Sequence, residues 1–286
     1  MYRRLSPMRT LGITVSAALF TRWASWFAPD PQPFLVPAGS ALAALGKEFE
    51  PKVNPELRDT FEIYSVPDGL VCRSVTAGEF AASPRDIRAR LVRGQCTTGR
   101  ALVPSVRAWP TPEMAKQADG HRFVWWPALL AGRESKILLP YVTEGRRPSR
   151  HAEVPESVWG AASALLPRAR VLGGTFPPGS GPNCFGTVMG AAGVPGAADI
   201  WMQREPFEAW LAAATRPGGH DDEPGTVLVW RSASGLVQHA AVTLGAGWAL
   251  HKPSQGWMSP TKVLTVDQVK GSARSVDRRL TRRTLA

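Results

Sequence analysis

Cys184 lies where the sequence predicts the first residue of a helix. The apolar residues Phe185, Val188, Met189 and Ala192 follow it at the spacing of one helical face. Free backbone N–H groups and the positive end of the helix dipole stabilise a thiolate at such a position, and the thiolate is the reactive form of cysteine. The position therefore favours a nucleophile, although a lone cysteine is more often a small buried apolar side chain.

Two histidines downstream strengthen the nucleophile hypothesis. His239 begins a strand-like run that ends at Gly245, and Trp248–His251 forms a second run after the turn. The resulting hairpin would place His239 and His251 side by side near one end. A base held by a third group is the arrangement that activates a cysteine or serine nucleophile.

The order of these motifs resembles the NlpC-type cell-wall cysteine peptidases. That family has a Gly-Gly loop, a cysteine at a helix start, a Pro-Gly strand and a hairpin with a histidine on each strand. The matching segments here are Gly173-Gly174, Asn183-Cys184-Phe185-Gly186, Pro224-Gly225-Thr226-Val227, His239-Ala240-Ala241-Val242 and Leu250-His251.

The resemblance implies an α+β, papain-like domain over residues 154–270, with an antiparallel sheet and an N-terminal catalytic helix. It implies hydrolysis of an amide bond in the stem peptides of peptidoglycan, with Cys184 as nucleophile, His239 as base and His251 as the orienting residue. It implies no cofactor, and no spacing of cysteine and histidine typical of a metal site is present.

Several positions depart from the family pattern. Asn183 stands where the family has aspartate, Phe185 where it has serine, Thr226 where it has aspartate, and Arg170 near the place of a tyrosine. Two alternatives therefore stay open: an acyltransferase or amidase acting on another small substrate, and a non-catalytic wall-associated module with an inert cysteine. Should His251 have no role, Gln238 or Asn183 would be the next candidates.

The net charge and the composition of the chain indicate which classes of binding partner are favoured. The chain of 286 residues is 44% hydrophobic and has a formal net charge of +11, which favours anionic wall polymers, anionic membranes or nucleic acid. No sequence-specific nucleic-acid motif and no phosphate-binding glycine loop is present. Arginines concentrate at the two ends, and residues 271–286 are expected to form a solvated basic tail.

The cellular compartment is open from the sequence. Residues 1–30 combine a basic start with the apolar run Leu11–Phe20, typical of a targeting signal or of an amphipathic helix. The run is too short for a transmembrane segment. Export to the cell envelope and a cytoplasmic location are both compatible with these features. Cys72 and Cys96 could pair only in an exported protein.

The segment 31–150 is expected to be a small mixed α/β domain of unknown role, joined by a polar linker at 143–154. We expect the helices and strands from hydrophobic periodicity and from Gly, Pro and capping signals. The expected helices are 40–49, 83–92, 155–166 and 205–214, and the expected strands are 61–66, 122–126, 136–142 and 263–266.

Overall fold

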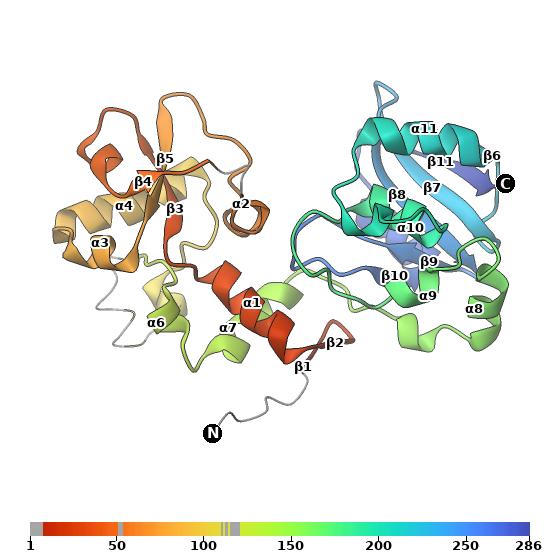
Figure 1. Ribbon diagram of the computed structural model, residues 1–286, viewed down its shortest axis with the longest axis horizontal. Helices are drawn as coiled ribbons and strands as arrows, with labels where there is room; N and C mark the ends of the chain where they lie inside the picture. Colours follow the sequence, from red (N-terminus) through yellow and green to blue (C-terminus); the bar gives the residue numbers. More distant parts are fainter. Residues whose placement is uncertain (1–7, 51–53, 110, 112–113, 115–120) are drawn as a thin grey trace. The chain divides into compact units, whose positions relative to one another are not determined.

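The computed structural model describes residues 8–50, 54–109, 111, 114 and 121–286. The chain divides into two compact units (Figure 1). The N-terminal unit is Ala17–Tyr141, and the C-terminal unit combines Val142–Ala286 with the first residues up to Ser16. Both units mix helices with antiparallel strands, which confirms the α+β prediction at that level. The boundary after Tyr141 lies next to the expected linker.

The N-terminal unit contains, within the described residues, a three-stranded sheet in the order β3-β5-β4. Its elements are α1 (Ala17–Phe27), β3 (Gln32–Pro37), η1 (Ala41–Ala44), β4 (Lys47–Glu48), α2 (Pro55–Phe61), β5 (Leu70–Val75), α3 (Ala77–Ala82), α4 (Arg85–Thr98), η3 (Val106–Ala108), α6 (Pro127–Leu130) and α7 (Glu134–Thr143), whose last residues enter the C-terminal unit. The buried Gln95 side chain fixes α4 on the sheet, because it bonds both the N–H and the C=O of Leu35.

The helix predicted at 83–92 is present as part of α4 but begins at Arg85, because Ser83 ends α3 instead of capping α4. Other predictions for this unit are wrong. Residues 136–142 form helix α7 instead of a strand, and Phe61 ends helix α2. Short apolar runs fit a strand and a buried helix equally well, so local pattern could not separate them. Residues 122–126 form no strand beyond an isolated bridge at Arg122, and 40–49 contains only the short turn η1 followed by β4.

The C-terminal unit is built on an antiparallel sheet with six strands among the described residues, in the order β10-β9-β8-β7-β11-β6. Its elements are β1 (Met8–Thr10), β2 (Ile13–Val15), η4 (His151–Glu153), α8 (Glu156–Ala162), α9 (Ala169–Leu172), α10 (Cys184–Ala191), η5 (Ala197–Asp199), α11 (Arg204–Ala214), β6 (Thr215–Pro217), β7 (Pro224–Ser232), β8 (Val237–Gly245), β9 (Trp248–His251), β10 (Lys262–Thr265), α12 (Val266–Ala273) and β11 (Arg278–Leu285). The helix predicted at 205–214 and the strand predicted at 263–266 are confirmed to within one residue, and the helix predicted at 155–166 is present but ends at Ala162.

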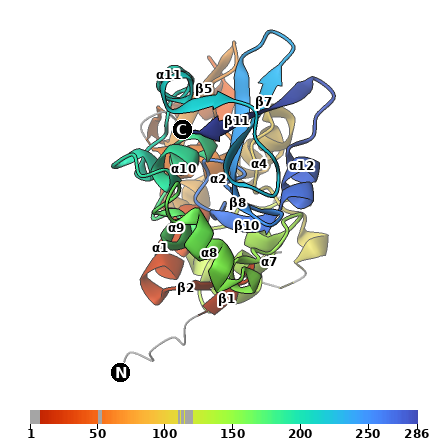
Figure 2. The same ribbon diagram turned by 90° about the vertical axis from the view of Figure 1, so that its right-hand side faces the viewer.

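The sheet is covered by helices on both faces (Figure 2). On one face α8, α10 and α11 cover an apolar cluster that includes Cys184, Ala240 and Val242. On the other face α12 covers a second cluster that includes Trp230 and Ala241. Alternate residues of β8 thus face different layers, as the pleat of a strand requires.

The expected basic tail at 271–286 is wrong. Residues 266–273 form α12, and residues 278–285 form β11, which pairs with β7 along its length and with β6 at its end. The segment has no apolar alternation to mark it as a strand, and long-range pairing places it in the sheet.

The expected targeting or amphipathic segment at 1–30 is structured where it is described. Met8–Val15 forms the hairpin β1-β2, and α1 buries Phe20, Trp23 and Phe27 on one side. The basic start at Arg3 and Arg4 lies outside the described residues. Within the described part of the chain, none of the helices has the length and apolar character needed to cross a membrane.

Candidate active site

Cys184 is the first residue of α10, as the sequence predicts. Asn183 caps the helix: its side-chain oxygen accepts from the N–H of Gly186 at 3.0 Å, and its amide donates to the carbonyl of Met202 at 2.8 Å. An amide can therefore replace the aspartate of the resembled family as a cap. Phe185 stacks on Phe207 of α11, with ring centroids 4.6 Å apart, and so anchors the helix start.

Gly186 allows the close approach of α10 to the following loop. A Cβ atom at this position would lie 2.2 Å from the carbonyl oxygen of Ala197, which is backbone and cannot move aside alone. We expect Gly186→Ala to destabilise the unit by about 1–3 kcal/mol through overpacking. Gly160 in α8 is the matched control, because a Cβ there meets nothing within 4 Å.

Urea unfolding of the full chain tests this expectation. Gly160→Ala should be neutral or stabilising by up to about 1 kcal/mol, since alanine favours a helix interior. Equal stability of Gly186→Ala and the unchanged protein would show that the close approach is not needed.

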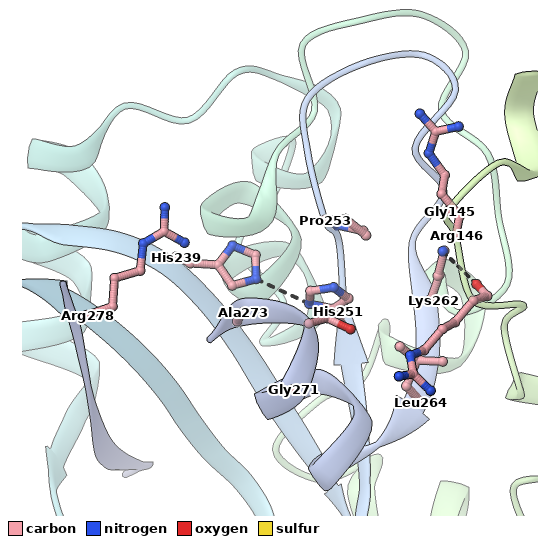
Figure 3. A pocket seen from close by; sticks show the side chains of 12 residues that line it. Gly145, Arg146, His239, His251, Pro253, Lys262, Leu264, Gly271, Ala273 and Arg278 are labelled. Atoms are coloured by element: carbon pink, nitrogen blue, oxygen red, sulfur yellow. Dashed lines mark hydrogen bonds between the residues drawn. The ribbon is translucent and has the colours of Figure 1, made fainter. Parts of the chain in front are cut away.

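The hairpin brings the two histidines together. Nε2 of His239 lies 3.2 Å from Nδ1 of His251, and the ring centroids are 5.1 Å apart at 74° (Figure 3). Since a neutral imidazole has one donor and one acceptor nitrogen, this contact fixes complementary tautomers. It leaves Nδ1 of His239 without a hydrogen bond to any described residue.

A bulge just before His239 aims its side chain. Trp230 pairs with His239, whereas the next residue of β7, Arg231, pairs with Val237, so Gln238 is the extra residue. The imidazole of His239 packs against Trp230 at 5.4 Å. Bulges commonly re-aim a side chain beside a functional site, and this one also leaves Gln238 exposed.

The thiol of Cys184 lies against the start of β8, the strand that carries His239. The backbone N–H of Ala240, the residue after His239, lies near enough to the sulfur to lower the pKa of the thiol. Among the described residues, however, no hydrogen bond joins the sulfur to His239 or His251. Cys184 belongs to the cluster under α10, while His239 packs on Trp230 of the opposite cluster. The structure thus pairs the histidines and places the thiol next to their strand without bonding it to them.

Burial controls the charge of the thiol. It raises the pKa of Cys184 to about 11, although the nearby backbone N–H groups of Ala240, Phe185 and Cys184 itself act in the opposite direction. The effect expected from a helix start is present, but the loss of hydration outweighs it, because only 9% of the residue is exposed. The resting site therefore holds a neutral thiol at neutral pH.

Burial also keeps the histidines neutral. Burial, together with a smaller effect of the nearby Arg278 guanidinium, lowers the pKa of His239 to about 4. The pKa of His251 is well below its usual range because of burial first, and then because of His239, Lys262 and Lys252. A neutral imidazole is the form that can accept a proton from a thiol.

These shifts predict acid sensitivity of the C-terminal unit. The pKa of His239 falls from 6.5 to about 4 on folding, so the unfolded chain binds a proton in this range that the folded chain does not. The neutral ring of His239 therefore contributes to the free energy of unfolding above pH 6.5, and this contribution is lost as the pH falls toward 4. It is at most about 3 kcal/mol.

Urea unfolding between pH 7 and pH 4 measures this contribution. His239→Gln should flatten the pH dependence, whereas His220→Gln, a change at an exposed histidine, should leave it as in the unchanged protein. Identical pH dependence in His239→Gln and the unchanged chain would contradict the assignment.

A pocket of about 400 Å³ opens beside the histidine pair, on the face covered by α12. Its lining includes both rings and four cationic residues, and Cys184 is not part of it (Figure 3). These residues are Arg146, Arg147, His239, His251, Lys262 and Arg278. Lys262 was not among the site residues expected from the sequence, and Arg278 was expected in the basic tail. Lys262 stands directly before the strand predicted at 263–266, but only the sheet register shows that it pairs with His251.

The other cysteines and histidines form no further candidate site in the described part of the chain. No group of three His, Cys, Asp or Glu residues there could hold a metal ion. Cys72, Cys96 and Cys184 are all free, with Cys72 buried and Cys96 exposed. His151 bonds Ser149 at 3.1 Å and packs under Gly174 of the Gly-Gly loop, which indicates a structural role.

Comparison with known proteins gives no relative. No family model, no curated protein and no solved structure matches this chain. The function must therefore be argued from the site.

Proposed function

We propose that the C-terminal unit is a cysteine hydrolase with a papain-like fold that cleaves an amide bond in the peptide part of peptidoglycan. The observation that carries the proposal is the contact between Nε2 of His239 and Nδ1 of His251 at 3.2 Å. It leaves the other nitrogen of His239 available, and the backbone N–H of the next residue, Ala240, lies near the sulfur of Cys184. The choice of peptidoglycan is supported by the resemblance in motif order and by the chain's net charge of +11.

The proposed reaction starts from a neutral thiol at Cys184 and a neutral imidazole at His239. As the sulfur of Cys184 attacks the carbonyl carbon, its proton passes to Nδ1 of His239, and His251 holds the resulting imidazolium in orientation. His239 then gives the proton to the leaving amine, and water hydrolyses the thioester to restore the thiol. In this proposal the backbone N–H of Cys184, at the start of α10, would donate to the oxyanion. Because the ring of His239 packs on Trp230 of the cluster under α12 while Cys184 lies in the cluster under α10, proton transfer requires the ring to turn from its present position toward the start of α10.

One observation favours a second candidate, the non-catalytic wall-associated module. Cys184 is buried and its pKa is raised, as for an inert structural cysteine. An acyltransferase or amidase on another substrate would use the same residues as the proposed hydrolase.

Alkylation during digestion separates the candidates. Purified peptidoglycan is incubated with the full chain, new amino groups are counted, and iodoacetamide is added while modification of each cysteine is followed by mass spectrometry. Activity should fall in step with labelling of Cys184 and not with labelling of the exposed Cys96. Absence of new amino groups, or activity that persists after Cys184 is fully labelled, would rule out the proposed hydrolase.

A further inference from the structure

In the described part of the chain, the pocket beside the histidine pair is lined by positive charges without negative ones. Arg146, Arg147, Lys262 and Arg278 contribute to its lining, and no aspartate or glutamate is among the described residues that line it. Both histidines are held neutral, so they do not offset this charge or add to it at neutral pH. A cleft lined by one sign of charge concentrates ligands of the opposite sign.

Among these four cationic residues, Lys262 gives the strongest indication of a bound anion. The residue is 3% exposed, and its ammonium donates to the carbonyl of Arg147 at 2.7 Å. Burial, together with a smaller effect of Arg146, lowers the pKa of Lys262 to about 8. A buried ammonium has three N–H donors, and a single neutral acceptor leaves it without a compensating negative charge. An anion in the pocket would provide that charge.

Arg147 and Arg278 approach the pocket from different segments. Arg278 begins β11 and is close enough to His239 to lower its pKa, while Arg147 belongs to the segment before η4. Neither guanidinium makes a hydrogen bond or ion pair with another described residue, so both can donate to a ligand. Two guanidinium groups and an ammonium around one cavity fit the oxygens of a carboxylate.

We propose that this pocket is an anion subsite that binds a carboxylate of the substrate, on the side of the histidine pair away from α10. The inference rests on the proposed function for the identity of the ligand as substrate, but the subsite itself stands on the pocket and its cations. A bound carboxylate would also counter the positive charges of Arg278 and Lys262 beside the two rings. It would thereby favour the imidazolium that forms when His239 accepts a proton.

Anion binding to the full-length protein tests the subsite without any need for turnover. The probes are succinate and its uncharged analogue succinamide, titrated at constant ionic strength. The readout is the ring signals of His239 and His251 in NMR spectra, assigned from His239→Gln and His251→Gln. Succinate should shift both signals saturably, and succinamide should not. Arg278→Gln should weaken succinate binding roughly tenfold, as expected for one lost charge-assisted hydrogen bond.

Arg279 provides the matched control, since it is the next residue of β11, is exposed and does not line the pocket. Arg279→Gln should bind succinate like the unchanged chain, and Arg147→Gln should weaken binding as Arg278→Gln does. Equal effects of Arg278→Gln and Arg279→Gln, or no saturable shift by succinate, would overturn the subsite. Inorganic phosphate shifting the signals at lower concentration than succinate would overturn the assignment to a carboxylate.

Digestion of peptidoglycan fragments separates this inference from the proposed function. One preparation is divided, and the carboxyl groups of one half are converted to methylamides. Faster hydrolysis of the free-acid half supports the subsite as a substrate site. Hydrolysis of both halves at equal rates overturns its role in substrate binding and leaves the hydrolase intact. Saturable succinate binding with no hydrolysis of either half supports the subsite and removes the hydrolase.

Discussion

Cys184→Ala is expected to abolish hydrolysis while leaving the C-terminal unit folded. Removing the nucleophile of a comparable catalytic set lowers the turnover rate by a factor on the order of 10⁶. The change removes one sulfur atom from a site where α10 is fixed by the Asn183 cap and the stacking of Phe185 on Phe207. The loss of stability should therefore be small, about 1 kcal/mol.

Turnover of purified peptidoglycan and urea unfolding, measured on the same samples, check both parts of this prediction. Cys96→Ala is the control for cysteine replacement, because that thiol is exposed and lies in the other unit. Turnover by Cys184→Ala near the rate of the unchanged protein would refute the nucleophile. Loss of folding in this variant alone would assign Cys184 a structural role.

The two histidines are expected to respond differently to replacement. His239→Ala removes the proton acceptor and should lower turnover by a factor on the order of 10⁶. His251 only orients the ring of His239 through the 3.2 Å contact, and losing the orienting group of a triad costs on the order of 10⁴. We therefore expect His251→Ala to retain more activity than His239→Ala.

Replacements of His251 that keep a hydrogen-bonding group sharpen this prediction. Asparagine and glutamine can each accept a hydrogen bond from Nε2 of His239, so His251→Asn and His251→Gln should retain more activity than His251→Ala. Steady-state rates for the three variants measure the order. Equal rates in all three would remove His251 from the site. Asn183 already caps α10, so Gln238 would then be the next residue to examine.

The local parts of the site could be predicted from the sequence. The apolar spacing after Cys184 indicates α10, and Gly245-Ala246-Gly247 indicates the turn of the hairpin that brings the side chains of His239 and His251 together. Both features depend on residues close in the chain, so periodicity and turn chemistry are sufficient to find them.

The parts that depend on distant segments could not be predicted. The strand Arg278–Leu285 has few apolar residues, and only its pairing with β7 and β6 shows that it belongs to the sheet. The pocket cations come from three separate segments that the register brings together. The charge of Cys184 could not be predicted either. A helix start favours the thiolate, but packing by distant segments removes water from the sulfur and favours the neutral thiol.

The most direct test of the proposed hydrolase is the mass of the products that the unchanged protein and Cys184→Ala release from the same peptidoglycan preparation. Cleavage of an amide predicts pairs of fragments whose masses add to that of a parent fragment plus one water. The unchanged protein should release these pairs, and Cys184→Ala should not. The same pairs from both proteins, or no new fragments from the unchanged protein, would contradict the account.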